Sequence, residues 1–205
     1  MTATSTSPSM QIPVAVSARH VHLTQATIEQ LFGADYRLHG LRSLSQPHEF
    51  AADDTVTIVG PSGSITHVRV LGPPRHEDQV EISRSDAVHL GIPALVRISG
   101  ELRDTPGATL IGARGELQLT HGVIIAHRHI HMNPADALRF GLRDRDVVAV
   151  AINSNDRDLV FGDVSVRVSR DFVTELHLDT DEANAADIAP GTTATLLPAG
   201  LPTAG

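Results

Sequence analysis

The stretch Arg19-His-Val-His-Leu-Thr24 recurs further along the chain as Arg128-His-Ile-His-Met-Asn133. Each copy is followed by a short helical pattern that ends near a glycine, Gly33 in the first copy and Gly141 in the second. Both histidines of a copy lie on one face of an extended strand, because side chains alternate along a strand with a period of two. Each copy therefore predicts a strand, a turn and a short helix with a glycine C-cap.

A third copy, Asp78-Gln-Val-Glu-Ile-Ser83, leads into a helical pattern that ends near Gly91. Glu81 precedes Gly91 by ten positions, as the second histidine of the second copy, His131, precedes its glycine. The repeat therefore places Glu81 where the other copies have a histidine. Repeated strand–turn–helix units predict duplicated small β-barrels related by a pseudo-two-fold axis.

The remaining pattern is mainly that of short strands separated by Gly, Pro, Asn and Asp turns. Val14 to His22 and Val123 to His131 read as two long extended runs. The other predicted strands are Thr55–Val59, Thr66–Leu71, Gln79–Ser83, Ala94–Ser99, Asp146–Ile152, Asp163–Val168 and Thr193–Leu197. The predicted helices are Gln25–Phe32, Arg84–Leu90, Pro134–Phe140 and Glu182–Ala186. This pattern predicts a mainly β fold with a few short helices.

The amino-acid composition excludes several kinds of catalytic and binding site. The 205 residues include 12 histidines and no cysteine, so thiolate metal sites, disulfides and an acyl-cysteine intermediate are excluded. The net charge of −8 disfavours nucleic-acid binding through a broad basic surface. The apolar runs are too short to cross a membrane, and residues 1–10 have neither the basic residue nor the apolar core of a secretory signal, which predicts a cytoplasmic protein. An anionic substrate then needs a locally positive site made by metal ions and a few arginines.

Two His-x-His pairs on strands suit chelation of zinc or a similar metal. We predict that His20, His22, His129, His131 and Glu81 hold metal. His177 shares a strand face with Glu175 and Asp179, so its pattern also fits a solvated polar face. His127 lies farther along its strand, and the remaining histidines, which lack partners at chelating spacing, are His39, His48, His67, His76, His89 and His121.

The turn Gly72-Pro-Pro-Arg75 presents an arginine six residues before Glu81. A planar guanidinium beside a metal suits bidentate binding of phosphate or carboxylate, although Arg75 also fits an ordinary surface position.

Together these motifs resemble the PduL-type phosphate propanoyltransferases, or phosphotransacylases, over about Ile12 to Leu197. The segments that carry the resemblance are Val14-Ala-Val-Ser-Ala-Arg-His-Val-His-Leu23, Leu71-Gly-Pro-Pro-Arg75, Gln79-Val-Glu81, Arg128-His-Ile-His-Met-Asn-Pro134, Phe161-Gly-Asp-Val164 and Glu175-Leu-His-Leu-Asp-Thr-Asp-Glu-Ala-Asn184. The resemblance implies two intertwined β-barrels. We expect residues 12–22 and 123–197 in the first and 23–122 in the second, with tails at 1–11 and 198–205.

The resemblance also implies the activity and the site. Propanoyl or another short acyl group would move between coenzyme A and inorganic phosphate, by direct attack at a site with two divalent metals, usually zinc. The implied metal ligands are His20, His22, Glu81, His129, His131 and His177. Arg75 would bind phosphate and serve catalysis, and the implied coenzyme A contacts are Ser17, Arg42, Arg69, Leu71, His177 and Asn184.

Family enzymes of propanediol degradation often carry an N-terminal helix that directs them into a bacterial microcompartment. Residues 1–11 are too short and too polar to form it, which leaves contact with shell proteins open. A homo-oligomer without membrane contact is expected.

Other functions stay open at this point. A cupin-like iron or manganese oxygenase also uses His-x-His with a glutamate and a distant histidine, but it has no use for the second pair or the Gly-Pro-Pro-Arg turn. A TIM-barrel metallohydrolase needs about 250 residues of alternating strands and helices. A structural zinc module would have a coordinatively closed site.

Overall fold

A computed structural model describes residues 11–154 and 156–197. The predicted tails at 1–11 and 198–205 lie outside this part, apart from Gln11, which begins the first strand. The described residues form two compact units, and each is made from separate stretches of the chain. The barrel unit contains residues 11–16, 128–178 and 182–197, and the sheet unit contains residues 17–127 and 179–181.

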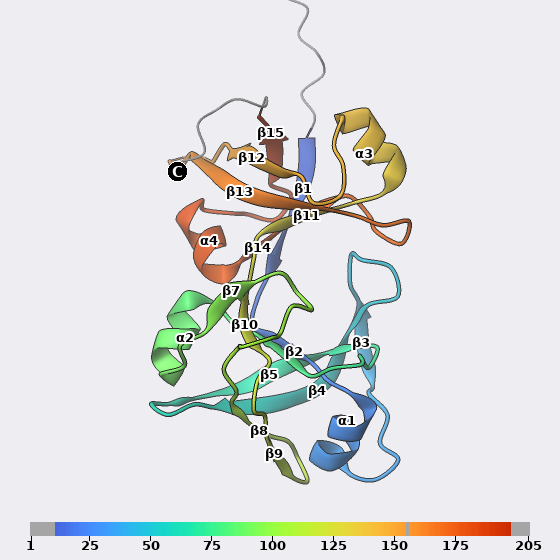
Figure 1. Ribbon diagram of the computed structural model, residues 1–205, viewed down its shortest axis with the longest axis vertical. Coiled ribbons are helices and arrows are strands. Elements are labelled where there is room, and N and C mark those ends of the chain that lie inside the picture. Colours follow the sequence, from blue (N-terminus) through green and yellow to red (C-terminus); the bar gives the residue numbers. More distant parts are fainter. Residues whose placement is uncertain (1–10, 155, 198–205) are drawn as a thin grey trace, which may run out of the picture. The chain divides into compact units, whose positions relative to one another are not determined.

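Six strands of the barrel unit close in the order β1-β14-β11-β13-β12-β15 (Figure 1). They are β1 (Gln11–Ser17), β11 (His129–Met132), β12 (Val147–Ile152), β13 (Leu159–Val168), β14 (Glu175–Asp179) and β15 (Thr193–Leu196). Helices α3 (Pro134–Phe140) and α4 (Thr180–Ala185) accompany them. The core is mainly aliphatic, with Ile130, Val164 and Leu176 fully buried, and it includes the rings of Phe140 and Phe161.

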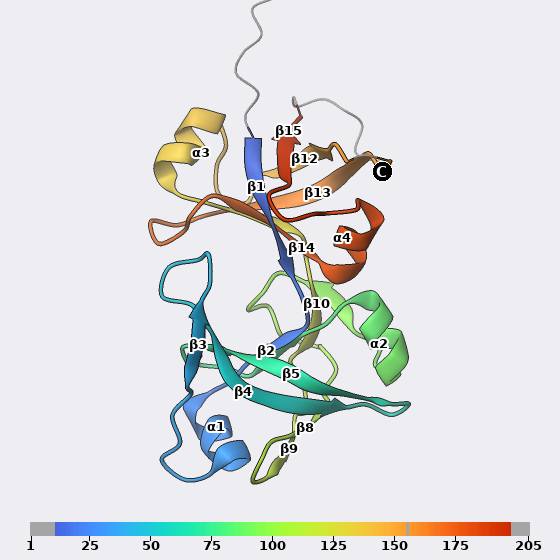
Figure 2. The same cartoon turned by 180° about the vertical axis from the view of Figure 1, so that it is seen from behind.

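Nine strands form the sheet unit in the order β7-β10-β6-β2-β5-β4-β8-β9, with β3 paired to β4. They are β2 (His20–His22), β3 (Gly40–Ser43), β4 (Phe50–Val59), β5 (Ser64–Gly72), β6 (Gln79–Glu81), β7 (Leu95–Arg97), β8 (Thr109–Ile111), β9 (Glu116–Gln118) and β10 (Val123–Ala126). The long β4–β5 hairpin is clearest in Figure 2. Helices α1 (Gln25–Phe32) and α2 (Arg84–Leu90) complete the unit, whose core includes Val21, Leu31 and Val80.

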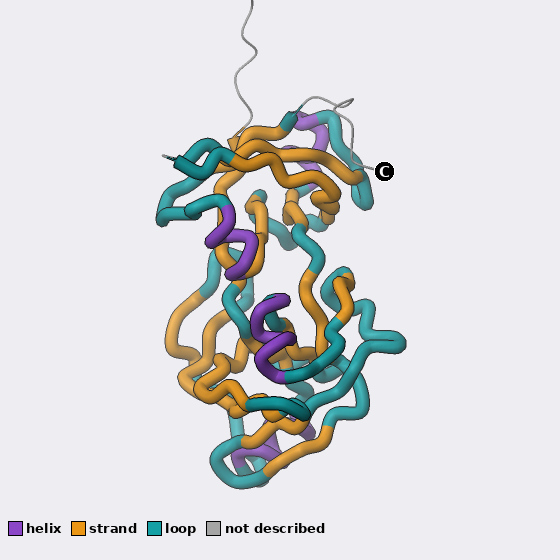
Figure 3. The backbone as a smooth tube through the Cα atoms, turned by 90° about the vertical axis from the view of Figure 1, so that its left-hand side faces the viewer, coloured by secondary structure: helices purple, strands orange, loops and turns teal. Residues whose placement is uncertain are grey.

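The helices are short because strong signals end them. Asn133 caps α3 by accepting a hydrogen bond from the backbone N–H of Asp136, and Ser83 and Asp86 form a capping box on α2. Gly91 and Gly141 end these helices in the left-handed conformation that glycine adopts without strain. Figure 3 shows how little of the backbone is helical beside the strands. Among the described helices none is long and apolar enough to span a bilayer.

The mainly β class with few short helices is confirmed. The prediction of two long extended runs was wrong in one respect. Each run is broken into two strands, at residues 18–19 and at residues 127–128. Each break falls beside a boundary between units, so β1 pairs within one unit and β2 within the other. For the same reason residues 17–22 and 123–127 belong to the sheet unit and not, as predicted, to the first barrel.

Candidate metal centres

Three predicted ligands meet in the interior of the sheet unit. His20 and His22 lie on β2 and Glu81 lies on the neighbouring antiparallel strand β6, directly opposite His20. All three side chains are buried. Nε2 of His20 lies 3.2 Å from Nε2 of His22 and 3.5 Å from a carboxylate oxygen of Glu81. We call these residues the sheet-unit triad.

The sheet-unit triad has the geometry of a metal site. Zinc binds nitrogen and oxygen at about 2.0–2.2 Å, so neighbouring ligand atoms of a tetrahedral site lie about 3.3 Å apart. The separations of 3.2 and 3.5 Å match this spacing, and Nε2 of His22 lies 4.0 Å from the other carboxylate oxygen of Glu81, Oε1. Nδ1 of His20 lies 2.8 Å from the carbonyl oxygen of Ala18, to which it donates as N–H. That hydrogen bond leaves Nε2 of His20 with the lone pair that a metal needs.

Electrostatics also favours a cation here. Burial lowers the pKa of His22 well below its ordinary range, and the charges of His20 and Arg75 add to this effect. His22 is therefore neutral near pH 7, as a ligand must be. Burial also acts to lower the pKa of His20, but the carboxylate of Glu81 outweighs it and raises that pKa. The carboxylate of Glu81 thus favours a positive charge beside it. A bound divalent ion would supply that charge in place of a proton on His20.

The other three predicted ligands, His129, His131 and His177, meet in the barrel unit, and we call them the barrel-unit triad. His129 and His131 lie on β11, and His177 lies on the antiparallel strand β14, opposite His129. Their ligand atoms all lie within 4.8 Å of one another. The ring of Phe172 stacks on His131 with centroids 4.0 Å apart, which fixes the orientation of that imidazole. A set of three imidazoles suits zinc and similar transition metals.

The same strand register builds both triads. In the sheet unit, the residue opposite the first histidine is Glu81, and in the barrel unit it is His177. Three positions after each of these residues a helix begins, α2 or α4. His177 therefore belongs to a fourth copy of the repeat. This copy could not be recognised in the sequence, because the helix begins at Thr180 without a clear cap, two residues before the predicted start at Glu182.

Beside each triad an ion pair links the strand that carries the two histidines to a helix. Arg19, which precedes His20, makes two hydrogen bonds of 2.7 and 2.8 Å to Asp86 on α2. Arg128, which precedes His129, lies 3.1 Å from Glu182 on α4. Asp86 and Glu182 both stand five residues after the third ligand of their triad. The repeated arginine thus connects the His-x-His strand to the helix that follows the third ligand.

Arg75 lies near the sheet-unit triad, because its backbone N–H donates at 2.9 Å to the carbonyl of Leu23, the residue after His22. Its charge also acts to lower the pKa of both His20 and His22. Its guanidinium lies 3.2 Å from Glu49. The side chains of Arg75 and Glu49 are 36% and 33% exposed, so their ion pair is weak.

The predicted coenzyme A contacts fall in both units. Arg69 and Leu71 lie on β5 opposite His20 and His22, and the guanidinium of Arg69 donates to the carbonyls of residues 52 and 53. Ser17 ends β1, Arg42 is exposed on β3, and Asn184 is exposed on α4 in the barrel unit. These contacts stay predictions. None of His39, His48, His67, His76, His89, His121 and His127 belongs to either triad.

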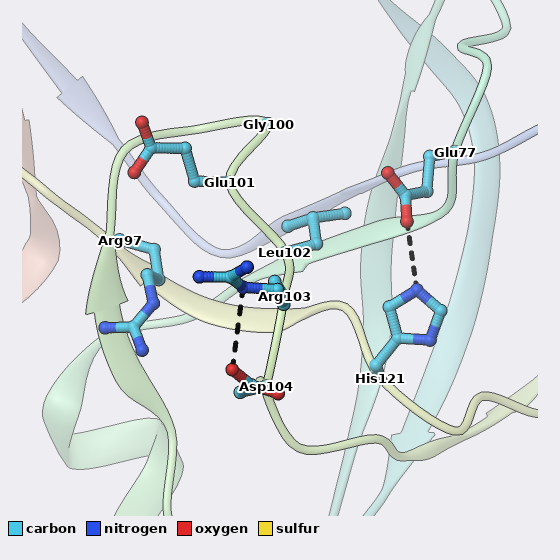
Figure 4. Close-up of a pocket in the computed structure, with 8 residues that line it drawn as sticks. All are labelled: Glu77, Arg97, Gly100, Glu101, Leu102, Arg103, Asp104 and His121. Carbon is cyan, nitrogen blue, oxygen red and sulfur yellow. Dashed lines mark hydrogen bonds and ion pairs between the residues drawn. The ribbon is translucent and has the colours of Figure 1, made fainter.

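A cavity of about 670 Å³ in the sheet unit lies apart from these residues (Figure 4). Its charged lining residues are Glu77, Arg97, Glu101, Arg103, Asp104 and His121, and none of them is a triad residue. Two ion pairs lie among them, from His121 to Glu77 at 2.9 Å and from Arg103 to Asp104 at 3.7 Å. The residues of the two candidate metal centres therefore do not line this cavity.

Comparison with known proteins supports the motif-based assignment. Residues 13–189 match the phosphate propanoyltransferase family. The chain belongs to this family. The phosphate propanoyltransferase of Thermotoga maritima is 55% identical over 180 residues, which cover 88% of this chain and 86% of that protein. The phosphate propanoyltransferase of Salmonella typhimurium is 51% identical over 175 residues, which cover 85% and 83% of the two chains. That of Levilactobacillus brevis is 50% identical over 178 residues, covering 87% and 85%. All six predicted ligands lie within the matched region.

Proposed function

We propose that this protein transfers a short acyl group, propanoyl in the first instance, between coenzyme A and inorganic phosphate. The reaction is acyl-CoA + phosphate = acyl phosphate + CoA. The observation that carries the proposal is a pair of triads, buried in the sheet unit and half-buried in the barrel unit, in a chain of the phosphate propanoyltransferase family. An oxygenase would use one such triad, and neither a second triad nor Arg75 would have a role in it.

We infer that each triad holds one divalent ion, most suitably zinc. The donor spacing in the sheet unit and the three imidazoles in the barrel unit support this choice. Bound divalent ions supply Lewis-acid stabilisation of the negative charge that develops on the carbonyl oxygen.

Arg75 is the group we assign to phosphate. Its guanidinium is partly exposed, and its partner Glu49 lies on one side at 3.2 Å. Two parallel hydrogen bonds from a guanidinium to phosphate oxygens fix both the position and the orientation of the anion. Holding phosphate against the thioester removes much of the entropic cost of bringing two substrates together.

The acyl group should pass directly between the two substrates. The chain has no cysteine, and none of the side chains in either triad is a Ser, Thr or Lys nucleophile. A phosphate oxygen attacks the thioester carbonyl, a C–O bond forms, and the C–S bond breaks. The thiolate of coenzyme A leaves with the electron pair and takes up a proton from solvent.

Direct attack predicts sequential kinetics with no acyl-enzyme. Initial rates measured over a grid of propionyl-CoA and phosphate concentrations should give intersecting double-reciprocal lines. Protein mixed with labelled propionyl-CoA in the absence of phosphate should carry no label after denaturation. Parallel lines together with stoichiometric label would show a covalent intermediate and overturn direct attack.

We also infer a cytoplasmic, homo-oligomeric enzyme that serves propanediol degradation. The predicted lack of an encapsulation helix concerns residues 1–10, which lie outside the described part of the chain.

A further inference from the structure

Gln79 stands two residues before Glu81 on β6 and is buried, with 2% of its surface exposed. All of its side-chain hydrogen-bonding groups have partners. Its amide nitrogen donates to Glu81 Oε1 and, at 2.8 Å, to the hydroxyl of Ser99. Its amide oxygen accepts a hydrogen bond of 2.8 Å from the backbone N–H of Gly100. A buried amide with every group satisfied is held in one orientation.

The hydrogen bond from Gly100 identifies which atom of the Gln79 amide is the oxygen and which is the nitrogen. A backbone N–H can only donate, so the oxygen of Gln79 must point to Gly100 and its nitrogen to Glu81. The hydroxyl of Ser99 accepts from Gln79 and donates its own hydrogen to Glu81 Oε1 at 3.1 Å. One oxygen of the Glu81 carboxylate thus receives two hydrogen bonds, and the other, Oε2, lies 3.5 Å from Nε2 of His20.

We propose that Gln79, together with Ser99, is a positioning residue that holds Glu81 through Oε1 so that Oε2 faces Nε2 of His20 as a metal ligand. The inference rests on the proposed metal function of the sheet-unit triad. Its physical basis is that a carboxylate fixed before the metal binds loses less conformational freedom on binding.

The equivalent position in the barrel unit offers a reason why residue 79 is an amide and not a carboxylate. The residue opposite His22 is Gln79, and the residue opposite His131 in the matching register is Glu175. Glu175 lies 3.1 Å from Nε2 of His177, a ligand that is not an anion. A second carboxylate beside Glu81 would instead meet a like charge in a buried site. The position two residues before the third ligand therefore holds an amide, Gln79, where that ligand is the anion Glu81. It holds a carboxylate, Glu175, where that ligand is His177.

The test compares zinc affinity in wild type, Gln79→Leu, Gln79→Glu and Ser99→Ala, measured by competition with a chromophoric chelator. We expect one of the two zinc sites to weaken roughly 10- to 100-fold, the usual effect of losing an outer-sphere partner, while the other keeps its affinity. Gln79→Leu, which removes the amide hydrogen bonds without adding a charge, should weaken it most. Gln30→Glu places the same change on the exposed face of α1 and should alter neither site. The visible spectrum of the cobalt-loaded protein should change in the Gln79 variants.

The outcomes separate this inference from the proposed function. A wild type that binds no zinc would contradict the metal function itself. A wild type that binds two zinc ions, with variants whose two affinities stay within twofold of it, would overturn the positioning role alone. Ser99 is half-buried, so Ser99→Ala decides the question if the Gln79 variants fail to fold.

Discussion

Replacing His20 or His129 by alanine is expected to lower phosphate-dependent release of coenzyme A roughly 100- to 1,000-fold. Each substitution removes one of three protein ligands from a triad. A Lewis acid contributes several kcal/mol of transition-state stabilisation, and each 1.36 kcal/mol is about tenfold in rate. Bound zinc should also fall from about two ions per chain to about one. Steady-state kinetics and metal analysis of the purified variants measure both effects.

His67→Ala is the matched control, because His67 is exposed on β5 and belongs to neither triad. It should keep both the rate and the zinc content of wild type. A His129→Ala variant that lost its zinc but kept full activity would show that the barrel-unit triad is structural. A His20→Ala variant with full activity would remove the sheet-unit triad from the mechanism.

Arg75→Ala is expected to raise the KM for phosphate roughly 10- to 150-fold with a smaller effect on the KM for propionyl-CoA. A hydrogen bond to a charged group contributes about 1.5–3 kcal/mol, which corresponds to about 10- to 150-fold in binding. Arg75→Lys keeps the charge but not the planar fork, so its KM should lie between those of wild type and Arg75→Ala. Initial rates at varied phosphate concentration give these values.

Arg37→Ala provides the control for charge alone. Arg37 is exposed and pairs with Glu29 at 3.3 Å, so its loss lowers the positive charge of the sheet unit without touching the triad. Its KM for phosphate should match that of wild type. An Arg75→Ala variant with an unchanged KM for phosphate would contradict the assignment of Arg75, and an equal rise in Arg37→Ala would point to a general charge effect.

Helices and ligand-bearing strands could be predicted from local signals. Helices α1, α2 and α3 have the predicted bounds, because a capping side chain begins each of them and a glycine ends each. The short strands β3, β8 and β9 were missed. They hold three or four residues each, and no alternation can be recognised over so few positions.

Longer-range features of the sites could not be predicted. The period of two places His20 with His22, and His129 with His131, but the contacts of Glu81 depend on a loop that returns to β6 about 18 residues later, at Ser99. The sequence pattern also could not show that the two extended runs break where the chain passes from one unit to the other. Local periodicity does not specify which strands pair across such distances.

The most direct test of the account is release of free CoA thiol from propionyl-CoA, with and without phosphate, before and after chelation. We expect release that requires phosphate, that stops when the metal is removed, and that returns when zinc is added. Release that continues unchanged in protein shown to be free of metal would contradict the role given to the two triads. No release from fully metal-loaded protein, with or without phosphate, would contradict the proposed reaction itself.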